Sequence, residues 1–148
     1  MKRSESLDVV QQVAARTERE RAERVGAAER HLIEMQQKLA ALEKYRSEYE
    51  NGFASRAGAG AGVVGMRDFQ TFLARLGEAL AQQRELIKLA EGALEAERSN
   101  WREAAQRAHV VETLADRWQS EERRAADRRD QQETDELSSQ RATSKERE

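Results

Sequence analysis

The sequence predicts an all-α protein, a long antiparallel hairpin of two helices that pack as a coiled coil. The chain has 148 residues, contains no proline and no cysteine, and is 36% Asp, Glu, Lys and Arg. Apolar residues recur every three or four positions in two long runs, which lie on either side of a glycine-rich segment. Proline is the strongest helix breaker, and a repeat of 3.5 residues is typical of a coiled coil. We therefore expect residues 1–148 to form a single elongated helical hairpin with a narrow apolar seam.

The first run predicts a helix over residues 3–52. From Val25 to Tyr49 its seam advances in alternating steps of three and four, and Arg46 is the one polar member. Upstream, the seam is expected to comprise Leu7, Val10, Ala14, Thr17 and Arg21. A second consecutive step of four then leads to Val25, so we expect a stutter that unwinds the supercoil near residues 17–25.

The second run predicts a helix whose paired part covers residues 66–118. Its seam has fifteen positions, of which thirteen are apolar: Phe69, Leu73, Leu76, Leu80, Gln83, Ile87, Ala90, Leu94, Glu97, Trp101, Ala104, Ala108, Val111, Ala115 and Trp118. We interpret Gln83 and Glu97 as polar residues that set the register of the two helices.

The segment between the runs, NGFASRAGAGAGVVG, contains five of the eight glycines and predicts a connector over residues 53–65. Glycine costs a helix about 1 kcal/mol relative to alanine, so the cluster is expected to end the first helix. Its last six residues, GAGVVG, match the dinucleotide-binding pattern G-x-G-x-x-G. That pattern binds a nucleotide only between a buried strand and a helix, and no strand precedes it. We therefore expect a bend and no nucleotide site.

Antiparallel pairing of the two runs leaves the last part of the chain without a partner. If Tyr49 packs near Phe69, Leu7 lies opposite Val111, and residues 119–148 overhang the first helix. These residues are almost entirely polar or charged. They are expected to form either a solvated, frayed helix or a segment that orders on a partner.

Aromatic residues are concentrated at the connector end of the hairpin. Five of the seven lie there: Tyr45, Tyr49, Phe53, Phe69 and Phe72. Heptad lettering places Tyr45 and Phe72 at position g, where the two helices of an antiparallel pair meet along one edge, and sets Lys38 opposite Ala79. Position g is usually charged, so these rings predict either a core widened near the turn or a docking patch.

Composition argues against several functions. The net charge is −2 with both signs interleaved, which argues against a nucleic-acid binder, and no run approaches the ~20 apolar residues that would insert into a membrane. His31 and His109 are too far apart in this pairing to share a metal. A two-helix rod offers no enclosed catalytic site, so we expect no enzyme, no metal and no cofactor. The absence of cysteine suits a reducing cytoplasm.

Two segments, QQKLAALEKYRSEY and FQTFLARLGEALAQQ, resemble the flagellar FliJ family of type III export proteins, and the resemblance covers most of residues 1–118. It implies a fold like the coiled-coil stalk of rotary ATPases, inserted by its terminal end into a hexameric flagellar export ATPase. It also implies contact with the cytoplasmic domain of the membrane export gate and with export chaperones. The protein would then act in flagellum biogenesis, motility and chemotaxis, in the cytoplasm and peripherally at the inner-membrane face of the basal body.

The resemblance also implies binding residues. Those for the export gate are Lys38, Leu42, Tyr45, Tyr49, Phe72, Leu76, Ala79 and Gln83. The family pattern has glutamine at Lys38 and histidine at Gln83, so the polar contacts differ here. By position alone, those for the ATPase ring are Leu7, Val10, Val111 and Trp118. A generic cytoplasmic coiled-coil scaffold and an injectisome stalk protein are the alternatives.

Overall fold

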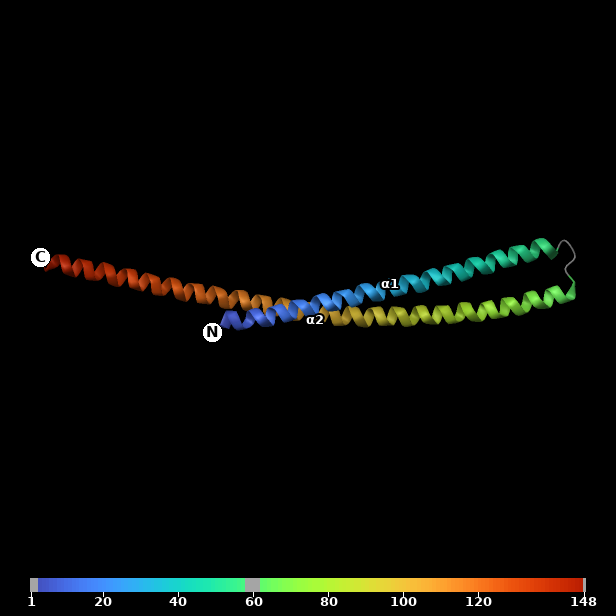
Figure 1. Ribbon diagram of the computed structural model, residues 1–148, viewed down its shortest axis with the longest axis horizontal. Helices are drawn as coiled ribbons and strands as arrows, with labels where there is room; N and C mark the ends of the chain where they lie inside the picture. Colours follow the sequence, from blue (N-terminus) through green and yellow to red (C-terminus); the bar gives the residue numbers. More distant parts are fainter. Residues whose placement is uncertain (1–2, 58–61, 148) are drawn as a thin grey trace. The chain divides into compact units, whose positions relative to one another are not determined.

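The computed structural model describes residues 3–57 and 62–147, and two helices account for nearly all of them. Helix α1 comprises Arg3–Ala57 and helix α2 comprises Val63–Glu146 (Figure 1). The predicted all-α fold class, two long helices packed against each other, is confirmed. None of the described helices contains a stretch that is both long and apolar enough to cross a membrane.

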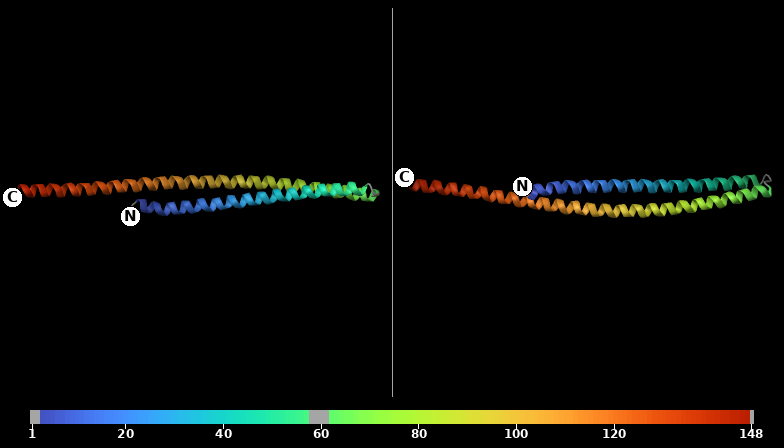
Figure 2. Two further views of the ribbon diagram at one scale, coloured as in Figure 1. Left: turned by 90° about the horizontal axis from the view of Figure 1, so that it is seen from above. Right: turned by 60° about the horizontal axis from the view of Figure 1, so that its bottom comes forward.

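Contacts divide the chain into two compact units, and each helix contributes to both. Unit 1 comprises residues 1–19 and 103–148, and unit 2 comprises residues 20–102. Within unit 2 the helices run antiparallel, since Glu29 contacts Arg98 whereas Glu43, further along α1, contacts Arg84 (Figure 2). Within unit 1 the start of α1 lies beside the part of α2 around Trp118 and Glu122.

The predicted seam of α2 is confirmed at every one of its fifteen positions, all of which are buried or half-buried. Leu80 is the most deeply buried of them. Seam residues return to the same face of a helix every 3.5 residues, so a single stripe can be covered by one partner helix. Most of each helix therefore remains exposed.

Near the start of α1 the predicted seam is confirmed at Leu7, Ala14, Thr17 and Arg21, which are buried or half-buried, and is wrong at Val10. Val10 is 49% exposed, whereas Gln11 and Glu18 are half-buried. The buried or half-buried positions continue back from Val25 in regular steps of three and four: Arg21, Glu18, Ala14, Gln11, Leu7 and Ser4. Thr17, a member of the expected stutter, is half-buried together with Glu18, so the buried face of α1 is wider there than elsewhere in the seam. A regular seam on α1 matches the regular seam of α2, and this fit outweighs the preference for valine over glutamine at one position.

The connector is shorter than predicted. Helix α1 continues five residues past the expected end at 52, and α2 begins three residues before 66. Phe53 stacks on Phe69, so packing offsets the low helix propensity of the neighbouring glycine. The backbone N–H of Met66 donates to the carbonyl of Gly62, which closes the first turn of α2. The predicted bend itself falls on residues 58–61, outside the described residues.

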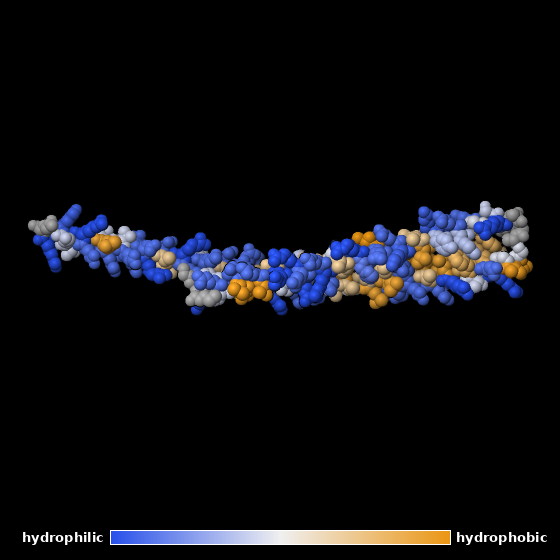
Figure 3. Space-filling model, viewed as in Figure 1, coloured by the Kyte–Doolittle hydropathy of each residue, from blue (hydrophilic) through white to orange (hydrophobic). Residues whose placement is uncertain are grey.

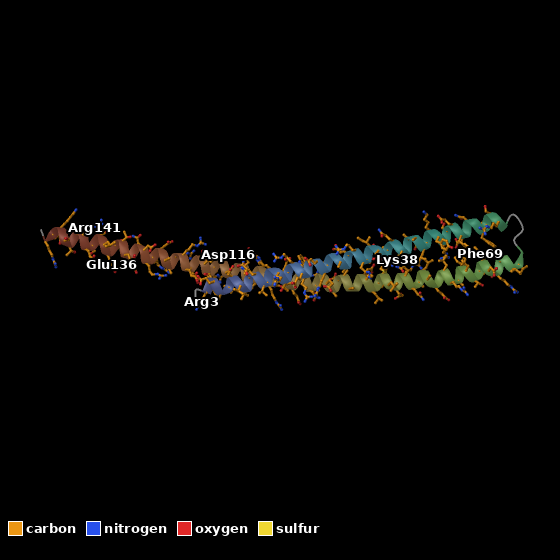
Figure 4. All side chains as sticks on the ribbon, in the orientation of Figure 1. Arg3, Lys38, Phe69, Asp116, Glu136 and Arg141 are labelled. Carbon is orange, nitrogen blue, oxygen red and sulfur yellow. The ribbon has the colours of Figure 1, made fainter. Side chains whose placement is uncertain are left out.

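The overhang of α2 begins slightly later than residue 119. Both the hydroxyl and the backbone N–H of Ser4 donate to the carboxylate of Glu122, so pairing in unit 1 reaches that residue. From residue 126 to residue 147 every described residue is exposed, and α2 remains helical to Glu146. Side chains such as Glu136 and Arg141 project from this part, and no described segment of α1 faces them (Figure 4).

Candidate functional site

Five aromatic side chains, the aromatic cluster, meet in unit 2 next to the connector. Phe53 stacks on Phe69 with ring centroids 3.8 Å apart, and Tyr49 stacks on Phe69 at 5.4 Å. Tyr49 also contacts Phe72 at 4.1 Å, and Tyr45 meets Phe72 edge-on at 5.9 Å. The predictions that Tyr49 lies near Phe69 and that Tyr45 faces Phe72 are confirmed. Figure 4 labels Phe69 on the side of α2 that faces α1.

Helical spacing explains how the cluster assembles. Tyr45, Tyr49 and Phe53 are four residues apart and so share one face of α1, while Phe69 and Phe72 are three residues apart on α2. Each pair of aromatic rings in such geometries contributes roughly 0.5–1.5 kcal/mol beyond simple burial. The cluster therefore holds the helices together where they approach the connector.

Exposure separates Tyr45 from the other members of the cluster. The other four rings are half-buried, whereas Tyr45 is 51% exposed. The four half-buried rings agree with the interpretation of a core widened near the turn. The exposed ring of Tyr45 agrees with the interpretation of a docking patch. Hydrophobic colours gather over unit 2 toward the connector, while the last part of α2 is almost entirely hydrophilic (Figure 3).

A hollow of about 220 Å³ adjoins the cluster on α1. Its lining comprises Tyr45, Glu48, Tyr49, Gly52, Phe53 and Arg56. A Cβ atom added at Gly52 would meet no other atom within 4 Å, so this glycine keeps the floor of the hollow open. Tyr45 lines this hollow together with Tyr49 and Phe53, so the hollow adjoins the exposed ring of the cluster.

The eight residues that the resemblance implies for gate binding differ in their access to the surface. Lys38 and Tyr45 are exposed, four are half-buried (Leu42, Tyr49, Phe72 and Ala79), and Leu76 and Gln83 are buried. The side-chain amide of Gln83 donates to the backbone carbonyl of Met35 at 2.9 Å. Its polar group is thus engaged inside the seam, in agreement with a register-setting role. Lys38 extends to Glu34, with its Nζ 3.5 Å from the carboxylate.

The opposite edge of unit 2 carries ion pairs instead of rings. Arg84 lies 3.5 Å from Glu43, and Arg98 lies 3.5 Å from Glu29. Both pairs are about half exposed, so each contributes at most about 1 kcal/mol. Sequence analysis missed these pairs, although heptad lettering places all four residues at position e, where antiparallel helices meet on their second edge. The two edges of unit 2 therefore differ in chemistry, one aromatic and one charged.

In unit 1, three of the four residues expected at the ATPase ring face the partner helix. Leu7 is buried, and Val111 and Trp118 are half-buried. Val10, the fourth residue, is exposed. The guanidinium of Arg3 lies 5.4 Å from the centre of the Trp118 ring and covers part of it. The three seam residues thus hold unit 1 together, and of the four expected contact residues only Val10 is exposed.

Unit 1 has other exposed apolar residues that sequence analysis did not single out. They are Val9, Val13, Val110 and Leu137. Val9 and Val13 lie on one face of α1 with Gln12, Arg16 and Arg19. The signal that could have found them is their place in the heptad, because they are large apolar residues at positions outside the seam.

Comparison with known proteins identifies one family. The family model described as the flagellar FliJ protein matches residues 2–147, which is essentially the whole chain. Among curated proteins and among solved structures, no match to the chain was found.

Proposed function

The chain belongs to the flagellar FliJ family, and on this premise we propose that it is the non-enzymatic stalk of the hexameric flagellar export ATPase. Membership makes it a component of the flagellar type III export apparatus. In the proposed role it promotes assembly of the ATPase ring, couples the ring to the membrane export gate and escorts export chaperones. It would work in the cytoplasm, peripherally at the inner-membrane face of the basal body.

We assign gate binding to the aromatic edge of unit 2, and the exposed ring of Tyr45 is the observation that carries this assignment. Tyr45 combines 51% exposure with a rigid support, because its ring rests on Phe72. Tyrosine is enriched among residues that dominate binding energy at interfaces, and such residues act best when they are held in place beforehand. Lys38, Leu42, Tyr49 and Ala79 would frame the contact, and the buried Leu76 and Gln83 would support it from inside.

We assign contact with the ATPase ring to unit 1. The exposed valines of this unit, including Val10, support the assignment, since each presents apolar surface that a partner can cover. The buried Leu7 and the half-buried Val111 and Trp118 would act indirectly, by keeping the two helices of unit 1 paired.

The double variant Tyr45→Ala with Phe72→Ala tests the assignment to the gate. We expect it to abolish capture of the gate's cytoplasmic domain while stimulation of the ATPase stays near the wild-type level. Each lost ring would contribute on the order of 2 kcal/mol if it behaves as a dominant interface residue. Ile33→Ala is the matched control, because Ile33 is an equally exposed apolar residue on another face of unit 2.

Three results would contradict the proposal. Unchanged gate binding would return Tyr45 and Phe72 to a purely structural role. Loss of ATPase stimulation by a double variant that is still helical would refute the division between the two units. A wild-type protein that neither stimulates the ATPase nor binds the gate would favour a generic coiled-coil scaffold.

A further inference from the structure

The seam of α1 differs in character between the two units. In unit 2 it is built mainly from large apolar residues, among them Leu32, Met35, Leu39, Leu42, Tyr49 and Phe53. Residues 3–19 are the described part of α1 in unit 1, and we call them the arm. The buried or half-buried positions of the arm that follow one another in steps of three and four are Ser4, Leu7, Gln11, Ala14 and Glu18. Leu7 is the one large apolar residue in this set.

The facing seam of α2 does not make up the difference. Three of its buried or half-buried positions in unit 1 are alanines, namely Ala104, Ala108 and Ala115. Stabilisation by apolar burial grows with the area removed from water, and alanine contributes little area. Polar residues on the arm and alanines on α2 therefore hold unit 1 less firmly than the leucines hold unit 2. The contacts of the chain divide at the same place, between residues 19 and 20 of α1.

We propose that the arm is detachable, and that it opens from α2 while the helices of unit 2 stay paired. A segment with few buried apolar contacts can open at a lower free energy than the whole fold. Opening is expected to stop where unit 2 begins. Met35 and Leu80 are buried there, and the hydrogen bond from Gln83 to Met35 ties the two helices together.

The arm, and not the facing part of α2, is the element that moves. Helix α1 begins at Arg3, so the arm is continuous with helix at one end only, whereas α2 extends on both sides of residues 103–125. Residues 103–125 also contain five alanines, while the arm contains three valines and a threonine, which favour a helix less. A helical segment as short as the arm is marginally stable without packing. The arm is therefore expected to lose helix when it detaches.

Contacts near the outer end of the arm keep it closed. The backbone N–H and the hydroxyl of Ser4 donate to the carboxylate of Glu122, and the guanidinium of Arg3 covers part of the Trp118 ring. Opening breaks these contacts and uncovers the seam residues Val111 and Trp118 of α2, which are half-buried in the closed state. The arm is thus a cover on apolar surface. A partner that binds this surface can reach it without unfolding unit 2.

Thiol labelling of the full chain tests the proposal. The chain has no cysteine, so one introduced thiol reports the opening of its own site. Ala115→Cys places the thiol in the seam that the arm covers, and Ala90→Cys is the matched control in unit 2; the two alanines are 5% and 3% exposed. We expect a thiol reagent in dilute urea to modify Ala115→Cys roughly tenfold faster or more, because its site opens without global unfolding. If circular dichroism shows lost helicity in Ala115→Cys, Ala104→Cys replaces it, since Ala104 is 7% exposed in the same unit.

Substitutions in the arm show which element opens. Leu7→Ala should speed labelling of Ala115→Cys several-fold and leave Ala90→Cys unchanged, because it removes apolar contact from the arm alone. Gln11→Leu should slow labelling of Ala115→Cys several-fold, since it places an apolar side chain at a half-buried position. Gln12→Leu is its matched control, because Gln12 is the exposed neighbour and should have no such effect. Hydrogen exchange should likewise be faster in the arm than in residues 28–42.

Four outcomes would overturn the inference. Equal labelling rates of Ala115→Cys and Ala90→Cys would mean that the hairpin opens as one unit. Equal acceleration of both sites by Leu7→Ala would mean the same. Fast labelling of Ala115→Cys that Leu7→Ala does not change, or an equal effect of Gln11→Leu and Gln12→Leu, would show that the arm does not control the opening. These measurements use neither the ATPase nor the gate, so their result is separate from that of the proposed function.

Discussion

The side-chain amide of Gln83 donates a hydrogen bond to the backbone carbonyl of Met35, 2.9 Å away and 48 residues earlier in the chain. Both residues are buried, and the Sδ atom of Met35 lies 3.6 Å from the same amide nitrogen. Since the bond can form only when these two residues face each other, it ties α1 and α2 to one register. A polar group inside a coiled-coil seam commonly has this effect, at some cost in stability.

Two substitutions at Gln83 should differ in their effect on the free energy of unfolding. A helical carbonyl already accepts one backbone hydrogen bond, so Gln83→Leu leaves no unpaired group at Met35 and should change the free energy of unfolding by less than about 1 kcal/mol. Gln83→Glu buries a carboxylate with no donor at Met35 and should destabilise the protein by about 1–3 kcal/mol at neutral pH. Urea unfolding followed by circular dichroism measures both. Equal effects would mean that the amide is not specifically placed.

Glu97 is the other polar residue of the α2 seam, and unlike Gln83 it has a buried polar atom that no described residue hydrogen-bonds. Its Oε2 atom is buried and has no hydrogen-bond partner among the described residues. Glu97→Leu removes this unpaired atom and extends the apolar seam, so it should raise the free energy of unfolding by about 1–2 kcal/mol. A melting temperature below that of the wild type would show that Glu97 is needed for the fold. Glu91→Leu, at an exposed position of the same helix, serves as the control.

Trp101→Ala should destabilise the protein more than Tyr45→Ala, although each change removes an aromatic ring. Trp101 is a half-buried member of the seam, whereas Tyr45 is exposed. Removal of a buried aromatic ring costs about 3–5 kcal/mol, and removal of an exposed one costs much less. Thermal melts of the two variants give the comparison. The reverse order would mean that the cluster depends on Tyr45 for its stability.

Gly52→Ala should stabilise α1. The glycine lies inside the helix, and an added Cβ atom meets nothing within 4 Å. Alanine is favoured over glycine in a helix by about 0.5–1 kcal/mol, so a gain of that size is expected in chemical unfolding. A larger residue tests the hollow separately: Gly52→Leu should occupy it and weaken gate binding. Unimpaired gate binding by this variant would exclude the hollow from the contact.

The end of α2 should exchange its backbone hydrogens faster than the paired parts of the helix. Residues 126–147 are exposed and have no facing helix among the described residues, so their amides can open by local fraying. Hydrogen–deuterium exchange should show weak protection there and strong protection around Leu80. If the segment orders on the ATPase ring, protection rises when the ring is added. Strong protection in the free protein would contradict this expectation.

The sequence by itself determined the fold class, the seam of α2 and two contacts of the aromatic cluster, Tyr49 with Phe69 and Tyr45 with Phe72. The reason is that each depends on local periodicity. A heptad repeat from Phe69 to Trp118 defines a single apolar stripe, which a partner helix must cover. A glycine-rich segment before it separates this helix from the first. Once Tyr49 is set near Phe69, the antiparallel geometry brings Tyr45 to Phe72, as observed.

Only the tertiary structure decided the details that depend on both helices at once. Val10 is more apolar than Gln11, yet Gln11 occupies the seam, because α1 keeps the regular register that α2 requires. Helix α1 passes Gly52 because stacking of Phe53 on Phe69 offsets the helix propensity of glycine. Exposure likewise depends on the partner: the same helix α2 buries Leu80 and leaves Leu89 on the surface, since α1 can cover only one of its faces.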